Sequence, residues 1–537
     1  MAINKLLFLW FYLSAHLIFA QEGRYALFLS DKAGTPYSVD NPSQFLSEKS
    51  INRRVNQSIP IVEEDLPVNS AYVTQVKDLG ADVLFTSKWF NAIIVQLDNG
   101  ELTSILSLPF ITGYEYLAPV QTSSGGRIKR IRSKKDSNLG IINQVQTTML
   151  GLDDMHTDGY KGAGITIGVF DSGFSGVDVG SPFQPLIAEG RLQLTVDLVG
   201  KTTNVFQYDD HGTEVLSIMA ADEPGVYRGG APEATYQLFV TEDVKSEFRI
   251  EEYNWLIAAE KADSAGVDII NSSLGYNLFD DPSMDYTIAQ LDGETAVISR
   301  AATRAFAKGI LVVSSAGNDG NTSWQFINPP ADAASVMAVG SITSTGSLSS
   351  FSSTGPTSDG RIKPDVVALG SSVSVVKANG TTGFTSGTSA SAPLVAGLAA
   401  GLRQAFPDLS VTELFDLIIL SGNLSQSPNN QLGYGVPNYA VASEILNPTE
   451  PEQPTALVSF YPNPVIDSLM ISFEIPAGQR AQISIFNLQG QQIMESEGGV
   501  TYANNPVVLD LSILSAGMYI LKVETQSILS TFRLVKL

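Results

Sequence analysis

Short apolar runs alternate with helical patterns along the middle of the chain. The runs consist mostly of aliphatic side chains, as strands buried on both faces do, and lie at residues 165–170, 236–240, 267–270, 310–313 and 336–339. Between them, apolar residues recur at helical spacing at residues 213–221, 251–265 and 295–308. This alternation predicts an α/β domain over residues 137–446 with a mostly parallel sheet, whose functional groups would gather at the carboxyl ends of its strands.

Two further patterns flank this domain. Residues 21–120 combine strand-like runs with helical patterns and predict a small α+β domain, with strands at 25–29, 83–85 and 92–97 and helices at 69–79 and 101–108. Residues 457–537 consist of short alternating runs and turns and predict an all-β sandwich, with strands at 468–474, 481–486, 507–511 and 518–523. A proline-rich acidic linker at 447–456 precedes this tail.

The first twenty residues predict an export signal. Lys5 is followed by an apolar run over residues 6–13, and Ala20 lies where a signal peptidase would cut. The run is shorter than the ~20 residues that a membrane-spanning helix needs, and no later run reaches that length. We therefore expect residues 1–20 to be removed and the mature chain to carry no transmembrane segment.

A basic linker follows the first domain, at residues 121–136. Its basic side chains are Arg127, Lys129, Arg130, Arg132, Lys134 and Lys135. This composition fits a solvated tether, and it fits equally a place where a front domain is cut away. The sequence leaves both interpretations open.

Composition and charge exclude several classes of function. The 537 residues include no cysteine, which rules out a thiolate metal site, a disulfide framework and a cysteine nucleophile. The formal net charge is −23, and residues 136–446 hold 35 acidic against 14 basic side chains. Such a chain is a poor partner for the phosphate backbone, so we expect no nucleic-acid binding.

Three residue types that nucleophilic catalysis needs stand in fitting places. Asp171 follows a predicted strand, His211 stands just before a helical pattern, and Ser389 stands near the start of an apolar helix. A neutral serine hydroxyl is a weak nucleophile, and it needs a base, a group that orients the base, and donors for the oxyanion. Each of the three residues alone is more often part of a turn or loop, so it is their conjunction that carries the hypothesis.

The sequence around Ser389 and two further residues bear on this hypothesis. Pro393 fits the first turn of the helix at residues 394–402, whose amides and dipole would favour negative charge near Ser389. Asn318, just after a predicted strand, could supply a side-chain donor to an oxyanion. His156, the other histidine outside the export signal, is interpreted as a surface loop residue.

Five motifs in this order resemble those of the subtilisin-like serine proteases. They lie at residues 170–173 (Phe-Asp-Ser-Gly), 211–213 (His-Gly-Thr), 271–275 (Asn-Ser-Ser-Leu-Gly), 315–318 (Ser-Ala-Gly-Asn) and 387–393 (Gly-Thr-Ser-Ala-Ser-Ala-Pro). The resemblance implies a three-layer subtilisin-like domain and a secreted serine endopeptidase that acts on protein or peptide substrates. Glu214, Tyr276 and Leu369 depart from the family pattern at positions that bear on substrate preference.

The resemblance also implies a role for each residue. Ser389 would attack the scissile carbonyl, His211 would act as base and then as acid, and Asp171 would hold the imidazole. Asn318 and the Ser389 amide would form the oxyanion hole. The residues implied to pair with the substrate backbone and to line the first specificity pocket are Ser273, Leu274 and Gly275.

The flanking domains resemble known parts as well. The first domain, with motifs at 77–83, 91–95 and 108–110, resembles the inhibitory and chaperone propeptide of such enzymes, which implies a zymogen. The tail, from 460–465 to 534–537, resembles the type A C-terminal sorting domain of the type IX secretion system. It implies that secretion machinery as a partner, and passage through the periplasm and across the outer membrane to the medium or the cell surface. The alternative is a β-sandwich adhesion module.

Other functions remain as alternatives. A catalytically dead surface-binding protein could keep the same fold, whereas a lipase-like esterase lacks its Gly-x-Ser-x-Gly signal here. We expect no cofactor for the chemistry and assign no metal site. Structural calcium is left open, because no calcium-loop spacing occurs in the acidic domain.

Overall fold

The computed structural model describes residues 22–120 and 143–446 and, in the tail, residues 458–473, 480–487, 490–500, 506–524 and 529–537. The predicted export signal and the basic linker lie outside these residues, as does the proline-rich linker. The described chain divides into two compact units. Residues 22–36 and 67–120 form the first, and all other described residues group with the second.

The first unit is a small α+β domain, as its sequence pattern predicts. Four antiparallel strands pair in the order β2-β3-β1-β4. Their bounds are Gly23–Leu29 (β1), Asp82–Ser87 (β2), Ala92–Leu97 (β3) and Ile111–Pro119 (β4), with helices Ser70–Asp78 (α2) and Asn99–Ile105 (α3). Leu27, Val76 and Ile93, from three different elements, are buried in one core.

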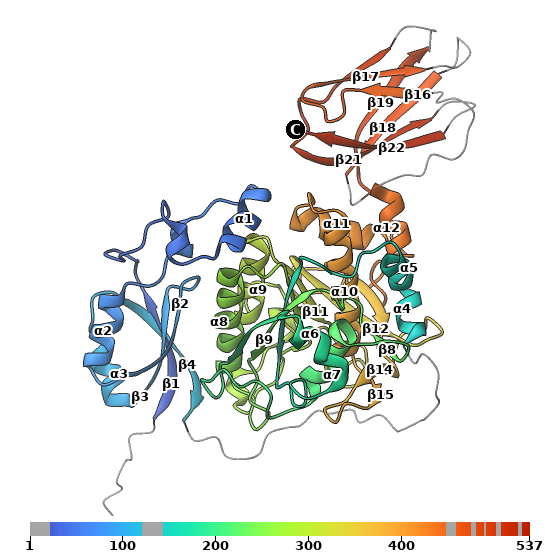
Figure 1. Cartoon of the computed structure of the whole chain (residues 1–537). Helices are drawn as coiled ribbons and strands as arrows, with labels where there is room; N and C mark the ends of the chain where they lie inside the picture. The colour runs from blue at the N-terminus through green and yellow to red at the C-terminus, as the bar shows by residue number, and fades with distance from the viewer. Residues whose placement is uncertain are drawn as a thin grey trace, which may run out of the picture. The chain divides into compact units, whose positions relative to one another are not determined.

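A seven-stranded parallel sheet forms the centre of the second unit (Figure 1). Its strand order is β13-β12-β11-β10-β5-β9-β6, and every neighbouring pair is parallel. The strands span Thr166–Asp171 (β5), Leu192–Asp197 (β6), Thr235–Val240 (β9), Ile269–Ser272 (β10), Leu311–Ser315 (β11), Val336–Ile342 (β12) and Val366–Leu369 (β13). The mostly parallel sheet predicted from the apolar runs is therefore confirmed.

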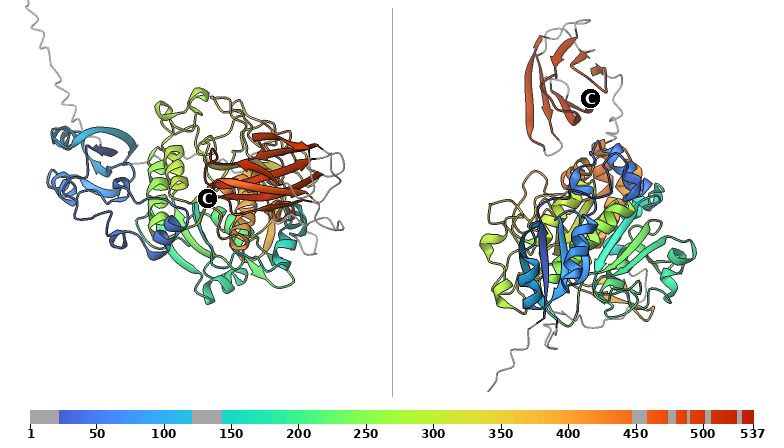
Figure 2. Two further views of the ribbon diagram at one scale, coloured as in Figure 1. Left: turned by 90° about the horizontal axis from the view of Figure 1, so that it is seen from above. Right: turned by 90° about the vertical axis from the view of Figure 1, so that its left-hand side faces the viewer.

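Helices cover both faces of this sheet. Successive side chains of each strand point to opposite faces, so each strand packs against helices on both sides. Val169 of β5 belongs to the core that includes Leu216 and Leu398, which lie on helices His211–Ala220 (α7) and Thr388–Ala405 (α10). The next residue, Phe170, packs edge-on against Trp255 of helix Ile250–Ala265 (α8), beside helix Val297–Ala307 (α9). The views in Figures 1 and 2 agree with three layers, two of helices around one sheet.

Shorter elements complete this α/β body. The helices are Gln144–Met149 (α4), Leu152–Thr157 (α5), Gln184–Ala188 (α6), Val411–Leu420 (α11) and Tyr439–Leu446 (α12). The short strands are Asp222–Glu223 (β7), Tyr227–Arg228 (β8), Val373–Val376 (β14) and Thr382–Thr385 (β15). Across the described residues, every helix is too short or too polar to span a bilayer.

The tail consists of two antiparallel sheets around one core. Their orders are β16-β17-β20 and β19-β18-β21-β22. The strands span Val458–Tyr461 (β16), Ser468–Phe473 (β17), Arg480–Phe486 (β18), Gln492–Val500 (β19), Val507–Asp510 (β20), Gly517–Glu524 (β21) and Leu529–Lys536 (β22). Leu469 from the first sheet and Ile483 and Leu521 from the second are buried in the same core, which gives a sandwich as predicted.

Residues 37–66 belong to the second unit although they lie within the stretch predicted as one front domain. Their helix α1 (Glu48–Asn56) brings two arginines onto the end of α8. Arg53 Nη2 lies 2.6 Å from Asp263 Oδ1, and Arg54 Nη2 lies 2.8 Å from Asp263 Oδ2. Arg54 Nη1 also lies 3.0 Å from Asp65 Oδ1. All four side chains are at most 2% exposed, so this segment is joined to the α/β body by a buried ion cluster.

Replacing Asp263 by asparagine should lower the free energy of unfolding by about 3–5 kcal/mol, because two buried guanidinium groups lose a shared carboxylate. Urea unfolding of the full chain measures the loss. Glu189→Gln is the matched control, since Glu189 pairs with Arg191 at the surface and is 61% exposed. Such exposed pairs contribute about 0–1 kcal/mol to the free energy of unfolding. Equal unfolding midpoints for the two variants would therefore contradict a large contribution from the buried cluster.

Candidate active site

Asp171 is the last residue of β5, at the carboxyl edge of the sheet. Its side chain is fully buried. Oδ1 accepts hydrogen bonds from the Ser172 amide at 2.7 Å and from the Ser172 hydroxyl at 3.2 Å, which fixes the carboxylate in one orientation. Strand β5 ends in the middle of the sheet, so Asp171 sits where side chains of neighbouring strands and helices converge.

His211 begins helix α7, and its Nδ1 lies 2.8 Å from Asp171 Oδ1. The imidazole is about one-third exposed, whereas its carboxylate partner is buried. Gly212 makes this close approach possible. A Cβ there would lie 2.4 Å from the Gly173 carbonyl oxygen and 2.9 Å from Asp171 Cβ. The helix can therefore start beside the strand end only because residue 212 has no side chain.

Ser389 is the second residue of α10, which begins at Thr388. Its hydroxyl thus lies within the first turn, where unpaired amides and the helix dipole favour negative charge. Pro393 lies inside this helix, so the prediction that it occupies the first turn is wrong. Gly387, with φ at +155°, precedes the helix, and a Cβ there would lie 2.9 Å from Ser389 Oγ. The lack of a side chain at residue 387 therefore leaves room for the hydroxyl of Ser389, which lines the pocket.

Asn318 follows β11 and is oriented by the residue before Ser389. Its Oδ1 accepts hydrogen bonds from the Thr388 amide at 2.8 Å and from the Thr388 hydroxyl at 3.1 Å. With the oxygen engaged in this way, the Nδ2 group is the end of the amide that is left to donate. The same contacts tie Asn318 to the start of α10, where Ser389 lies.

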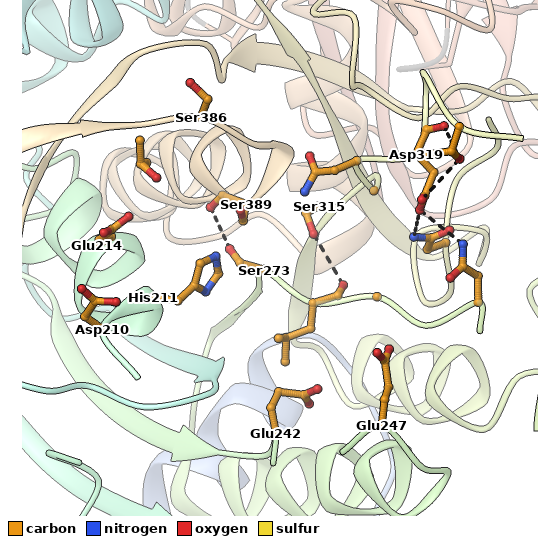
Figure 3. A pocket seen from close by; sticks show the side chains of 18 of the residues that line it. Asp210, His211, Glu214, Glu242, Glu247, Ser273, Ser315, Asp319, Ser386 and Ser389 are labelled. Atoms are coloured by element: carbon orange, nitrogen blue, oxygen red, sulfur yellow. Dashed lines mark hydrogen bonds between the residues drawn. The ribbon is translucent and has the colours of Figure 1, made fainter. Parts of the chain in front are cut away.

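One pocket, with a cavity volume of 1030 Å³, contains six of the seven residues singled out from the sequence. They are His211, Ser273, Leu274, Gly275, Asn318 and Ser389, and Asp171 lies behind His211. Figure 3 shows His211 and Ser389 on the same side of the pocket. The Ser273 hydroxyl donates to the Ser389 carbonyl at 2.9 Å, so the 273–275 segment is fixed against the base of α10.

The sequence analysis did not find two glutamates, Glu242 in the lining of the pocket and the buried Glu251. Burial raises the pKa of Glu242, and repulsion from Asp171 acts in the same direction. Burial and the nearby charge of Glu242 raise the pKa of Glu251 as well. The contact between the two carboxyl groups lowers the pKa of Glu242 and raises that of Glu251. In the sequence, Glu251 is only part of an acidic first turn of a helix.

His156 differs from its prediction as a loop residue. It lies on α5, half-buried, with Nε2 2.9 Å from the Gly230 carbonyl oxygen. Burial lowers its pKa, and it does not line the pocket. In the described ranges, no group of three or more histidine, aspartate or glutamate side chains is placed to hold a metal ion.

Comparison with known proteins identifies the family to which the chain belongs. The model of the subtilase family (Peptidase_S8) matches residues 162–435, about half of the chain, including every residue of the pocket described above. The chain belongs to the subtilase family. It is thus a serine-type endopeptidase with the subtilisin-like fold.

Two relatives from Bacillus give the same result over the α/β domain. The chain is 31% identical over 267 residues to subtilisin of Bacillus pumilus, covering 49% of this chain and 85% of the relative. It is 32% identical over 268 residues to subtilisin E of Bacillus subtilis, covering 49% of this chain and 61% of that one. The crystal structure of MycP1 from Mycobacterium smegmatis is 22% identical, with a TM-score of 0.48, over 62% of this chain and 92% of that chain.

The flanking domains match family models too. Residues 24–135 match the peptidase S8 propeptide domain of Bacteroidota. Residues 459–536 match the secretion system C-terminal sorting domain. Both identifications made from the sequence are confirmed, and the sorting domain implies export followed by release or attachment at the cell surface.

Proposed function

We propose that this subtilase cleaves peptide bonds through an acyl-enzyme formed on Ser389. His211 Nε2 takes the proton of the Ser389 hydroxyl as the oxygen attacks the scissile carbonyl, and then gives it to the leaving amine. Asp171 holds the imidazole through Nδ1 and stabilises its positive charge. Asn318 Nδ2 and the Ser389 amide donate to the oxyanion of the tetrahedral intermediate. Water then releases the acyl group by the reverse proton transfers, and no cofactor takes part.

The observation that carries the proposal is the 2.8 Å contact between Asp171 and His211, at the edge of the pocket that Ser389 lines. A buried carboxylate, fixed by the end of its own strand, orients the imidazole ring of His211. The first turn of α10 supports the developing oxyanion by its dipole. Ser273, Leu274 and Gly275 would pair with the substrate backbone along the pocket wall.

The chain is proposed to be made as a zymogen. Its front domain would inhibit the active site until the chain is cut within residues 121–136, and its leader and sorting domain would direct it through the periplasm and across the outer membrane. The match to a propeptide domain supports the first part of this proposal, and the match to a sorting domain supports the second.

Intact mass of the secreted protein tests the zymogen proposal. The wild-type chain should lose its front residues up to the basic linker, and the Ser389→Ala chain should keep them, because the cut is made by the enzyme itself. The Ser391→Ala chain is the control, since its hydroxyl is buried and donates to the Ala368 carbonyl at 3.2 Å outside the pocket. Identical trimming of the wild-type and Ser389→Ala chains would contradict self-processing.

A further inference from the structure

The pocket is lined by an excess of negative charge. Its carboxylates are Asp210, Glu214, Glu242, Glu247 and Asp319. Among the described residues that line it, Lys377 is the only lysine or arginine. Lys377 Nζ lies 2.6 Å from Glu214 Oε1, so this cation is already paired with one of the carboxylates. The walls of the pocket therefore present negative potential to a substrate.

Asp319 is a buried carboxylate in this wall. It follows Asn318 directly, and its side chain is 5% exposed. Oδ2 accepts hydrogen bonds from Asn328 Nδ2 at 2.9 Å and from Asn277 Nδ2 at 3.2 Å, as Figure 3 shows with dashed lines. Both donors are neutral amides, and they hold the carboxylate in one orientation.

A second acceptor lies beside Asp319. Asn328 is 6% exposed and lines the pocket, and its Oδ1 accepts no hydrogen bond from the described part of the chain. A buried oxygen in this state costs free energy unless a ligand supplies a donor. A carboxylate and an amide oxygen side by side match the several N–H donors of a guanidinium or ammonium group.

Asp319 also adjoins the proposed substrate wall. A Cβ added at Gly275 would lie 3.0 Å from Asn328 Cβ, and Asn328 in turn donates to Asp319. A side chain that enters along residues 273–275 would thus reach the Asp319 side of the pocket. Figure 3 shows Glu242 and Glu247 on a different side of the pocket from Asp319.

We propose that this pocket selects substrates with lysine or arginine at the residue that carries the scissile carbonyl, and that Asp319 is the residue that binds the cationic side chain. This inference rests on the proposed function and names its substrate class. A charge-assisted hydrogen bond to a carboxylate is stronger than one between neutral groups, so the cation is preferred over an apolar side chain of similar length.

The chain itself contains such a substrate. The linker at residues 121–136, the candidate processing region, holds six basic residues and one acidic residue. The whole chain has 32 lysine and arginine residues in 537, and six of them lie in this linker. A pocket selective for lysine and arginine would therefore direct self-processing to this segment.

Kinetics on a matched set of peptides tests the proposal. The full-length chain, processed as it is secreted, is first titrated with a fluorophosphonate probe to count active sites. Peptides that differ only in lysine, arginine, leucine or glutamate before the scissile bond are then compared. We expect kcat/KM to be about tenfold to a hundredfold higher for lysine and arginine than for leucine. Asp319→Asn should remove most of this preference, and Asp319→Glu should retain part of it.

The controls separate this proposal from the one on which it rests. Glu189→Gln removes a carboxylate outside the pocket and should leave the preference unchanged. A wild-type chain that reacts with the probe but cleaves the leucine peptide as well as the lysine peptide would overturn the proposal and leave the protease mechanism intact. Failure to react with the probe would overturn both. If Asp319→Asn does not fold, the preference of the wild-type chain decides the outcome.

Discussion

Replacing Ser389 by alanine should lower the turnover of a protein substrate by about a millionfold. The variant keeps the oxyanion donors and the substrate wall, but it has no oxygen that can form the acyl-enzyme, so what activity remains comes from binding and electrostatic stabilisation alone. Hydrolysis of casein by the processed protein measures the loss. Circular dichroism of the same preparations shows whether the fold is retained.

Ser391→Ala is the matched control for this loss. Ser391 lies on the same helix two residues further on, is fully buried, and bonds the Ala368 carbonyl instead of lining the pocket. Its replacement should leave turnover within a small factor of the wild-type value. A Ser389→Ala protein that hydrolyses casein as fast as the Ser391→Ala protein would show that another residue is the nucleophile.

Replacing Asp171 by asparagine should lower turnover by about ten-thousandfold at neutral pH. The carboxylate accepts from His211 Nδ1 at 2.8 Å and so holds the proton on that nitrogen. An amide can instead present its NH2 group to Nδ1, which stabilises the tautomer with the proton on Nε2. In that tautomer, Nε2 cannot accept the proton of Ser389. The loss should appear in kcat, because the substrate wall is unchanged.

Asp178→Asn is the control for this substitution. Asp178 follows β5 in the sequence, but its side chain is exposed and does not line the pocket. It should have little effect on kcat. An Asp171→Asn enzyme with nearly normal kcat would contradict the role given to the buried carboxylate, even if Ser389 proved to be essential.

The sequence predicts those strands in which nearly every residue is buried. The run at 236–240 lies within β9, where five of the six residues are buried, so a continuous apolar stretch is what such a strand requires. Strand Thr382–Thr385 (β15) was not predicted, because its residues are all half-buried and its sequence carries neither an apolar run nor a clear alternation.

The sequence fails where distant residues decide the local structure. Pro393 looks like the start of a helix because proline is tolerated best there, yet α10 begins five residues earlier. Arg53 and Arg54 are buried because they pair with Asp263, which lies more than two hundred positions away in the sequence. A local sequence pattern cannot predict an ion pair between residues so far apart.

Some residues of the candidate site could likewise be predicted from the sequence, and others could not. Asp171, His211, Asn318 and Ser389 were identifiable because each stands at the end of a strand or the start of a helix, within a motif of small residues. Glu242 and Glu251 were missed, since their mutual effect on pKa depends on packing between the end of β9 and α8. Asp319 follows a motif residue, but its amide partners at 277 and 328 become apparent only in three dimensions.

The central claim is that Ser389 is the nucleophile of a serine endopeptidase, and site-specific labelling tests it most directly. The secreted full-length product is treated with a fluorophosphonate, digested, and analysed by mass spectrometry to locate the adduct. We predict one adduct, on the peptide that contains Ser389, with labelling strongly reduced in the Asp171→Asn protein. A folded wild-type protein that carries no adduct, or carries it on another serine, would contradict the account.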